Sequence, residues 1–400
     1  MYTYKPDNAR VPIKIWSKEG SIEESAKVQL ENCAKLPFIF HHLAVMPDCH
    51  AGYGVTIGSV LVTENVVIPN AVGVDIGCGM CAVKTDWNIK DISMDKLKII
   101  MGKIREKVPV GFNHHKEKQD KDLMPVNFDD IINSSDFIVH HEYQNALTQL
   151  GTLGGGNHFI EIQKDKKDNV WVMIHSGSRN LGLKVAKYYN ELAKELNEKW
   201  YSPIDNKLEL SYLPLDIIEA KNYLKEMEYC LDFAFQNRKL MMNRIMLIFE
   251  DELFWKKSYD YYANMINIHH NYARLENHFG KNVMVHRKGA TFAGKDNMGI
   301  IPGSMGTKSY IVKGLGNPES FNSCSHGAGR KMGRKEAKRQ LDLVAELKNM
   351  DDKGIIHGMR NVEDLDEAAG AYKNIDEVMD NQLDMVEIVE ELSPVAVIKG

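Results

Sequence analysis

The sequence VGVDIGCGM, residues 72–80, is the stretch around which the rest of this chain is organised. It places a carboxylate, Asp75, three residues before a thiol, Cys78, and surrounds both with glycines. Glycines at this density allow backbone conformations that other residues avoid, and they allow a ligand to approach closely. An Asp and a Cys on one tight loop make a poor hydrophobic element but a good pair of metal ligands. The loop therefore predicts a metal site whose remaining ligands come from elsewhere in the chain.

Three histidines at the ends of apolar runs can supply those ligands: His158 in GTLGGGNHFIEI, His175 in IHSGSRN and His270 in INIHHNYA. A lone histidine is more often a hydrogen-bonded structural residue, but each of these adjoins a cluster of small polar residues, which favours ligation. His269 should point away from His270 if the segment is extended. Asp, Cys and His together suit Mn, Fe, Co or Zn, and the thiolate argues against Mg or Ca.

Cys78 and Cys81 form a CxxC pair, which has two common meanings. A redox dithiol should precede a helix, and half of a zinc site needs a second pair. Neither context is present, and MCAVKT after the loop is strand-like. We therefore expect Cys78 alone to bind metal, and Cys81 to point into the core as a small hydrophobic residue.

Length and composition limit the class of protein. Four hundred residues with 44% hydrophobic content can bury a large core, enough for one large domain or two ordinary ones. The formal charge of −5 argues against a protein that coats polyanions with its whole surface. Six cysteines without a framework spacing are typical of a reducing compartment. The N-terminus lacks the apolar core of a signal peptide, and no stretch approaches the roughly 20 apolar residues of a membrane span. We expect a cytoplasmic protein.

Strand-like and helix-like segments are mixed along the chain. SIEESAKVQLENCAKL (21–36) predicts a helix with a capping box, and the apolar run from Phe38 predicts a buried strand that ends at Pro47. The segment 214–253 is long for one helix, so we expect a bend or a helical hairpin there. IDEVMDNQLDMVEIVEEL (375–392) also has a helical pattern. Between these elements, 111–136 is polar and irregular, which is typical of a surface loop.

Two later motifs suggest phosphate chemistry. PGSMGTKS (302–309) resembles a phosphate-binding loop but does not match GxxxxGK[ST], so an ordinary turn is the alternative. In SCSHGAGRKMGRK, His326 lies between small residues and should be accessible, and we expect a helix to begin directly after it. Arg330, Arg334 and Lys338 recur every four residues. A run of charge is usually a solvated face, but this one follows a reactive-looking His and therefore favours a polyphosphate or a nucleic-acid backbone.

Taken together, VGVDIGCGM, GTLGGGNHFIEI, HSGSR, HHNY, PGSMGTKS, SHGAGR and the terminal VIKG occur in the order found in the RtcB family of RNA ligases. The chain resembles this family over nearly its whole length, most weakly at 111–136 and 201–213. The resemblance implies one α+β domain over residues 1–400. In it, mixed strands with peripheral helices would enclose a central dinuclear metal cleft, with a mainly helical insertion at about 183–255.

The resemblance also implies an activity. Members of this family are GTP- and Mn-dependent ligases that join an RNA 3′-phosphate or 2′,3′-cyclic phosphate to a 5′-hydroxyl. They act through a histidine-guanylate and an RNA-ppG intermediate, in RNA repair or tRNA splicing. The cofactors would be GTP and two Mn²⁺ ions, the substrate would be RNA with those ends, and an archease-like activator is a further partner that the family suggests.

Residue roles follow from the same resemblance. His326 would be the nucleophile toward GTP, and Cys78 would bridge the two metal ions. The metal ligands would be Asp75, Cys78, His158, His175 and His270. The guanylate contacts would be Asn157, Glu161, Ser304, Ser309, Tyr372 and Lys399, with Gly327, Ala328 and Gly329 on the phosphate side. Lys399 would read the guanine, and the RNA contacts would be Arg330, Arg334 and Lys338.

Two other functions compete with this one. A dinuclear metal phosphoesterase or nuclease would use the same ligands without GTP, and a non-catalytic RNA-binding repair protein would keep the basic residues yet tolerate loss of Cys78. Cys49, next to Asp48, and Cys81 are thiols that we do not expect at these positions in the family. They give the hypothesis that the protein is sensitive to oxidation.

Overall fold

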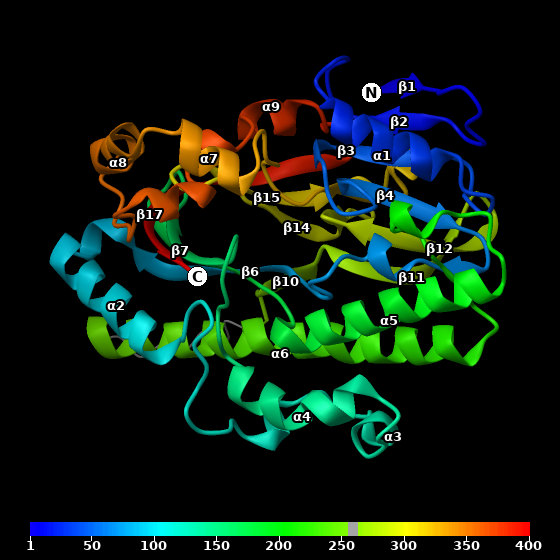
Figure 1. The fold of residues 1–400 in the computed structure, drawn as a ribbon. Coiled ribbons are helices and arrows are strands. Elements are labelled where there is room, and N and C mark those ends of the chain that lie inside the picture. The colour runs from blue at the N-terminus through cyan, green and yellow to red at the C-terminus, as the bar shows by residue number, and fades with distance from the viewer. Residues whose placement is uncertain (255–262) are drawn as a thin grey trace.

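Strands and helices alternate along the chain in a computed structural model that describes residues 1–254 and 263–400 (Figure 1). This mixture confirms the expected α+β class. A six-stranded sheet has the order β1 (Tyr2–Tyr4), β2 (Ile13–Ile15), β3 (Leu43–His50), β4 (Ile57–Thr63), β12 (Lys281–Lys288) and β11 (Asn271–His278). A seven-stranded sheet has the order β10 (Ile266–His269), β6 (Gly79–Asn88), β8 (Asn169–Ser176), β7 (Phe159–Lys164), β17 (Val386–Lys399), β15 (Ser309–Gly314) and β14 (Met298–Ile301). Two further pairs join β5 (Val66–Val67) to β9 (Leu213–Pro214) and β13 (Ala290–Phe292) to β16 (Ser323–Ser325).

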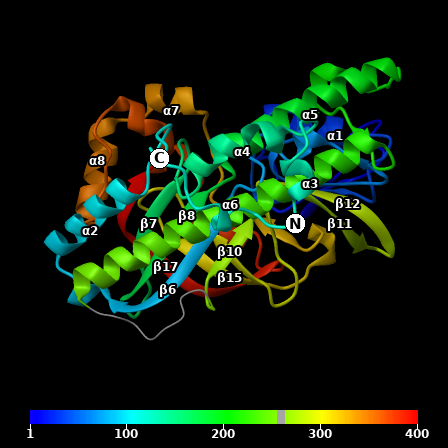
Figure 2. The ribbon, with the colours of Figure 1, turned by 90° about the horizontal axis from the view of Figure 1, so that it is seen from below.

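The helices lie around these sheets (Figure 1, Figure 2). They are α1 (Glu24–Ala34), α2 (Met94–Lys107), α3 (Asp129–Ile132), α4 (Ile138–Gln149), α5 (Arg179–Lys199), α6 (Ile218–Leu253), α7 (Arg334–Gln340), α8 (Leu343–Asp352) and α9 (Ile375–Asp380). The longest, α6, runs across the underside of the seven-stranded sheet (Figure 2). There Met241 and Ile245 of the helix pack in one core with Ile160 and Ile174 of the strands. Among the described residues, none of the helices has both the length and the apolar character to cross a membrane.

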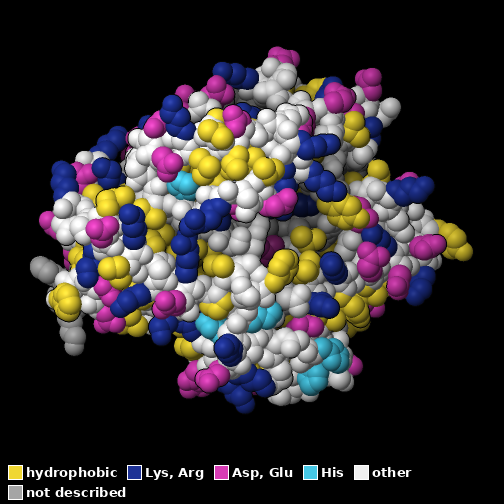
Figure 3. Space-filling view, turned by 60° about the vertical axis from the view of Figure 1, so that its left-hand side comes forward, with side chains coloured by type: hydrophobic (Ala, Val, Ile, Leu, Met, Phe, Trp, Pro, Cys, Tyr) yellow, Lys and Arg dark blue, Asp and Glu magenta, His cyan; other side chains and the backbone are white. Residues whose placement is uncertain are grey.

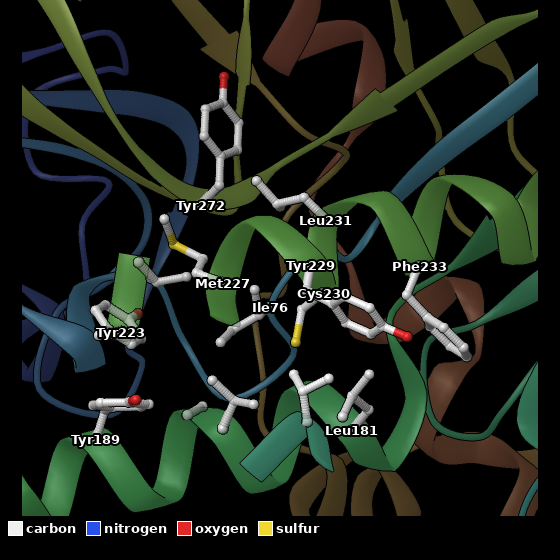
Figure 4. Packing of buried hydrophobic residues seen from close by; sticks show 14 of the residues in the cluster. Ile76, Leu181, Tyr189, Tyr223, Met227, Tyr229, Cys230, Leu231, Phe233 and Tyr272 are labelled. Carbon is white, nitrogen blue, oxygen red and sulfur yellow. The ribbon is translucent and has the colours of Figure 1, made fainter. Parts of the chain in front are cut away.

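A second core lies between α6 and α5 (Figure 4). Ile76, from the glycine-rich loop at residues 72–80, packs in it with Leu181 of α5 and Cys230 of α6. Full burial of such a side chain stabilises a fold by roughly 1.5–3 kcal/mol. The hydrophobic residue in the middle of the loop therefore anchors Asp75 and Cys78 on either side of it.

The segment 214–253 forms one continuous helix from residue 218, so the expected bend or hairpin is wrong. Buried side chains recur in it from Ala220 to Phe249. The reason is that α6 crosses first the α5 core and then the underside of the sheet, so that successive turns all find a packing partner. The helical insertion expected at about 183–255 corresponds to α5 and α6, and its last residue lies outside the described residues. Its separation from the rest of the domain stays a prediction.

The C-terminal segment 375–392 is not one helix, which corrects a second expectation. Helix α9 ends at Asp380, and β17 begins at Val386. The first part of β17 pairs with β15 and the second part with β7, both antiparallel. Local pattern allows a helix in this stretch, but pairing on successive partners makes it a central strand of the sheet.

Two details near the N-terminus also differ from expectation. The helix at 21–36 is present as α1, but Ser21 donates its hydroxyl hydrogen to the Lys18 carbonyl at 2.6 Å and does not cap it. Strand β3 does not end at Pro47 but continues to residue 50. Its pairing with β4 is irregular between residues 45 and 50, so the missing N–H of Pro47 is tolerated there.

Between 111 and 136 the chain is mostly irregular, as expected, apart from one 3-10 turn and the short α3.

Candidate functional site

Close packing against α6 positions the glycine-rich loop. Gly77 has φ +75°, and a Cβ there would lie 3.0 Å from the Cβ of Ala234 and 3.1 Å from the carbonyl oxygen of Cys230. A side chain at this position would be strained by both the backbone conformation and the contact. Glycine therefore lets the loop lie directly on α6, with Cys78 one residue before β6.

Strand order in the seven-stranded sheet brings the three predicted imidazole ligands together at the aligned ends of neighbouring strands. Strands β10, β6, β8 and β7 are consecutive neighbours. Gly79 of β6 pairs with Ser176 of β8 and His269 of β10, and Phe159 of β7 pairs with His175. The predicted ligands lie in or beside these aligned strand ends. Residues far apart in the sequence therefore converge because of sheet register.

All five predicted metal ligands come together at these strand ends. Cys78 Sγ lies 3.4 Å from His158 Nε2 and 3.3 Å from His175 Nε2. His158 Nε2 lies 3.1 Å from Asp75 Oδ2, and His175 Nε2 lies 3.4 Å from His270 Nε2. Ligand bonds of about 2.0–2.3 Å separate neighbouring ligand atoms by about 3–3.7 Å. The spacing therefore fits a metal centre, with Cys78 between the Asp75 half and the His270 half.

Burial sets the protonation of these groups. It lowers the pKa of His158, and it lowers the pKa of His175 and His270 well below the usual range. The imidazoles are therefore neutral, which is the form that binds metal. Burial, with Asp75 adding to it, raises the pKa of the Cys78 thiol well above its usual range. A bound cation is the ordinary means of holding such a thiol as a thiolate.

His269 faces away from this cluster, as the extended pattern predicted. Its Nδ1 lies 3.1 Å from the Gly77 carbonyl oxygen and 3.1 Å from Arg238 Nη2. Cys81 is also where the sequence placed it, fully buried in the core between the sheet and α6. The CxxC pair is therefore divided between a position in the candidate metal cluster and a packing position.

Two adjacent residues of α6, Asn237 and Arg238, hold the backbone that carries the ligands. Arg238 is fully buried, and its Nη1 donates to the carbonyls of Gly77 at 3.0 Å and Ser176 at 2.8 Å. Asn237 Oδ1 accepts from the amides of residues 151 and 152 at 2.7 and 3.1 Å, and its Nδ2 donates to Ser176 Oγ at 3.1 Å. Sequence reasoning missed both. The available signal was that two polar residues fall within an otherwise apolar helical stripe.

His326 lies beside the metal cluster and is oriented by a buried carboxylate. Its Nδ1 is 2.6 Å from Asp48 Oδ2, which also accepts from the backbone amides of His326 at 3.0 Å and Gly327 at 3.3 Å. Asp48 is fully buried, and the rings of His326 and His270 have their centroids 4.8 Å apart. Asp48 was absent from the predicted site. The sequence feature that could have indicated Asp48 is a carboxylate at the end of an apolar run.

The chain after His326 is not helical at once, so the helix expected directly after it is wrong. Gly329 has φ +71°, and a Cβ there would lie 2.1 Å from a carbonyl oxygen of β3. The backbone turns sharply at this glycine, and Arg330 then forms a bridge with Tyr372. Helix α7 begins only at Arg334. Close approach to β3 takes precedence over local helix propensity.

Carboxylates pair with all three predicted RNA contacts. Glu367 Oε1 lies 3.3 Å from Arg330 Nη1 and 2.8 Å from Arg334 Nε. Lys338 contacts Glu363 instead, at 2.5 Å. Arg330 and Arg334 line the cavity described next, whereas Lys338 does not. These three cations therefore do not form a free basic face on one helix, because each has a carboxylate partner and Arg330 lies before the start of α7.

A cavity of about 440 Å³ opens beside His326. Figure 3 turns forward the side that carries α7, α8 and the C-terminus, and it shows a hollow near the middle with Lys and Arg side chains around it. The cavity is lined by most of the predicted guanylate contacts: Asn157, Glu161, Ser304, Gly327, Ala328, Gly329, Tyr372 and Lys399. Ser309 lies just behind this lining, where its hydroxyl oxygen accepts from Gln163 Nε2 at 3.0 Å and from the Gly303 amide at 3.3 Å.

Two ionisable groups, the buried Glu161 and the half-buried Lys399, line this cavity. Burial raises the pKa of Glu161 to about 7, and burial lowers the pKa of Lys399. Lys399 Nζ lies 3.9 Å from Glu367 Oε2 and 5.8 Å from the centre of the Phe159 ring. A buried acceptor, a half-buried donor and an aromatic face together suit the edge and the face of a purine base.

Comparison with known proteins agrees with this arrangement. Residues 29–400 match the family model described as tRNA-splicing ligase RtcB. The chain is 40% identical to the RNA-splicing ligase RtcB of Escherichia coli (strain K12), over 97% of each chain. It is 34% identical to the tRNA-splicing ligase RtcB of Nanoarchaeum equitans (strain Kin4-M), over 99% of this chain and 97% of that one. A match of this extent, through residues that converge on one site, shows that the chain belongs to the RtcB family.

Proposed function

We propose that this protein is a GTP-dependent RNA ligase that joins a 3′-phosphate or 2′,3′-cyclic phosphate end to a 5′-hydroxyl end, with His326 as the nucleophile. The observation that carries the proposal is the hydrogen bond between His326 Nδ1 and the buried Asp48 carboxylate at 2.6 Å. A carboxylate that accepts from Nδ1 fixes the proton on that nitrogen and leaves the lone pair on Nε2. A neutral imidazole of this kind can attack phosphorus and form a labile phosphoramidate.

The ligand set supports a manganese-like divalent ion next to this nucleophile. Asp75, Cys78, His158, His175 and His270 would hold two such ions, with Cys78 shared between them. When bound, the ions would neutralise the triphosphate and stabilise the leaving pyrophosphate. The combination of a half-buried carboxylate, a buried thiol and neutral imidazoles suits Mn²⁺ and also Zn²⁺, Co²⁺ or Fe²⁺.

The cavity beside His326 would bind the nucleotide. Lys399 and Glu161 would contact the base edge at its inner end, and the backbone at residues 327–329 would lie on the phosphate side. Arg330 and Arg334 already face the cavity with Glu367 between them. A phosphate group can take the place of this carboxylate as their partner, because both are bidentate acceptors for guanidinium.

Three transfers complete the proposed reaction. The His326 Nε2–phosphorus bond forms as pyrophosphate leaves GTP. The guanylate then passes from His326 to the RNA 3′-phosphate oxygen, which gives an RNA-ppG end and regenerates the imidazole. Finally the 5′-hydroxyl oxygen attacks the RNA phosphorus, loses its proton and displaces GMP. A cyclic phosphate end would first be opened by water to the 3′-phosphate.

Intact mass spectrometry after incubation with GTP and Mn²⁺ tests the proposal. We expect the protein to gain the mass of one GMP and to lose it on addition of acid, because phosphoramidates are acid-labile. His326→Ala should abolish the gain, and His141→Ala, an exposed histidine on α4, should retain it. Metal-dependent cleavage of RNA ends without any guanylylation would contradict the proposal and favour the phosphoesterase. RNA binding that is unchanged in Cys78→Ala, with neither guanylylation nor ligation in the unmodified protein, would contradict it in favour of a binding protein.

A further inference from the structure

A second cavity, of about 340 Å³, adjoins the one beside His326. The two share part of their walls: Glu23, His50, Arg330, Lys331 and Tyr372 line both. The second cavity therefore lies directly beside the first, with these five residues between them. It continues toward the N-terminal segment at residues 17–21 and toward the start of α9.

Its lysines differ from Arg334 and Lys338 of α7 in having no acidic partner among the described residues. Lys18 and Lys331 are exposed and form no ion pair among the described residues, and Lys373 Nζ donates to the carbonyls of Pro47, at 3.2 Å, and Cys49. These three lysines come from three separate segments and line one concave surface. Converging cations without carboxylate partners are what a phosphate backbone requires.

Other lining groups fit a polar polymer better than a small apolar ligand. Asn374 and Asn381 offer amide groups, and Ser17 Oγ is buried without a hydrogen-bond partner among the described residues. Glu23 and Glu377 also line the cavity, and Glu23 Oε1 accepts from the Ala51 amide at 2.7 Å. The surface is thus basic only in part, which suits one strand with widely spaced phosphates.

The first cavity leaves little room for RNA once a nucleotide is bound. Its volume of about 440 Å³ lies toward the lower end of the range that encloses one small-molecule ligand. A ligase must hold RNA on both sides of the joining point, so at least one strand has to extend beyond that cavity. The adjoining concavity with unpaired lysines is the extension that the structure offers.

We propose that the second cavity binds the phosphate backbone of one single-stranded RNA segment next to the joining point, through Lys18, Lys331 and Lys373. This rests on the proposed ligase function and names a place for its substrate. It adds an RNA contact outside α7, at Lys18 and Lys331, which have no carboxylate partner that a phosphate would first have to replace, unlike Arg334 and Lys338.

Charge reversal tests the proposal. Lys18→Glu alone and together with Lys331→Glu should weaken binding of an RNA oligonucleotide, by about tenfold for the double variant, and should raise the KM for RNA in ligation. The slope of log Kd against log salt should fall by about 0.7 for each phosphate that the variant no longer neutralises. Binding is measured by fluorescence anisotropy with two probes, one ending in a 3′-phosphate and one in a 5′-hydroxyl. Weaker binding of either probe supports the proposal and identifies the strand.

Matched controls separate this effect from a general reduction of positive charge. Lys199→Glu and Lys221→Glu remove exposed lysines of α5 and α6, and they should change neither affinity nor slope. Lys18 lines only the second cavity, so Lys18→Glu should leave guanylylation by GTP unchanged. Equal effects in the controls, unchanged affinity for both probes, or loss of guanylylation in Lys18→Glu would overturn the proposal. If the unmodified protein binds RNA but is never guanylylated, the proposed function fails while this site stands.

Discussion

The two sides of the site are held by different kinds of interaction. On the metal side, one helix holds the ligand loops through fully buried groups, because Asn237 and Arg238 bond to backbone atoms next to the ligands. On the nucleotide side, Glu367 collects charged side chains from separate segments around a cavity that remains open. The backbone of the proposed metal side is therefore held by buried hydrogen bonds within the protein, whereas Arg330 and Arg334 on the proposed nucleotide side have a carboxylate partner that a phosphate could exchange. A site of this kind combines a rigid scaffold with an adaptable pocket.

The largest effect should come from Arg238 on the metal side. Arg238→Met removes the donors from two buried carbonyls and from Asn267 Oδ1, which accepts from Arg238 Nε at 2.7 Å. Each buried acceptor left unpaired costs about 1–3 kcal/mol, so the loss of three such bonds costs about 4 kcal/mol in total. We expect the free energy of unfolding in urea to fall by that amount and Mn²⁺ affinity to fall with it.

Two variants sharpen this test of the metal side. Arg238→Lys keeps the charge but not the fork of donors, so it should restore only part of the stability. Lys221→Met, on an exposed turn of the same helix, should change the unfolding free energy by less than about 0.5 kcal/mol. A decrease below about 1 kcal/mol in Arg238→Met would mean that α6 does not fix the ligand loops.

Glu161 should make the stability of the nucleotide side depend on pH. Its pKa is raised to about 7 by burial, from an ordinary value of 4.5, so the folded state binds its proton more tightly than the unfolded state. The stabilisation is complete below about pH 4.5 and is lost as pH rises through about 7. Glu161→Gln cannot lose a proton, so its unfolding free energy relative to wild type should rise between pH 5 and pH 8, by up to about 3 kcal/mol. Parallel stability curves over that range would show that Glu161 titrates normally.

Glu367→Gln should have a smaller effect on stability than on nucleotide binding. The substitution leaves Arg330 and Arg334 without their carboxylate, but the Arg334 side chain is 51% exposed and water can replace the partner. We expect a decrease of about 1 kcal/mol in unfolding free energy, well below that of Arg238→Met. The affinity for GTP, measured by calorimetry, should change by more than the stability does. An equal decrease of stability in Glu367→Gln and Arg238→Met would remove the distinction between the two sides.

The smallest effect should come from the surplus thiols. Cys49 and Cys81 are 2% and 0% exposed, and burial raises the pKa of each to about 12. Such thiols are neither accessible nor ionised, so the oxidation hypothesis loses its chemical basis. Cys49→Val and Cys81→Ala should leave the rate of peroxide inactivation unchanged. Slower inactivation in either variant would restore the hypothesis.

The donor types of the proposed metal site could be predicted from the sequence, because they depend on residue type and close neighbours. Asp75, Cys78 and the histidines at strand ends stand among glycines and small polar residues that leave little room for another role. The orientation of the His326 side chain could not be predicted from the sequence. Asp48 binds an imidazole 278 positions later in the chain, and nothing near either residue records that contact. Glu367 was missed for the same reason, because its partners are defined only by the folded cavity.

The predictions of secondary structure were wrong where pairing with distant segments outweighed the local sequence pattern. Residues 386–392 carry charges that suit a helix, but β15 and β7 provide backbone partners along the whole of β17. The residues after His326 suit a helix as well, but Gly329 must pass against β3. In both places long-range contacts set the backbone, and local propensity amounts to only a few tenths of a kcal/mol per residue.

The sequence by itself determined which donor atoms the chain offers to the proposed site, since donor chemistry belongs to each residue. Only the tertiary structure decided how those atoms meet. Sheet register aligns the ligands, a buried arginine fixes their backbone, and a buried carboxylate selects the free nitrogen of His326. Those decisions are electrostatic and geometric, and they require groups from distant segments to be buried together, where an unpaired polar atom is costly.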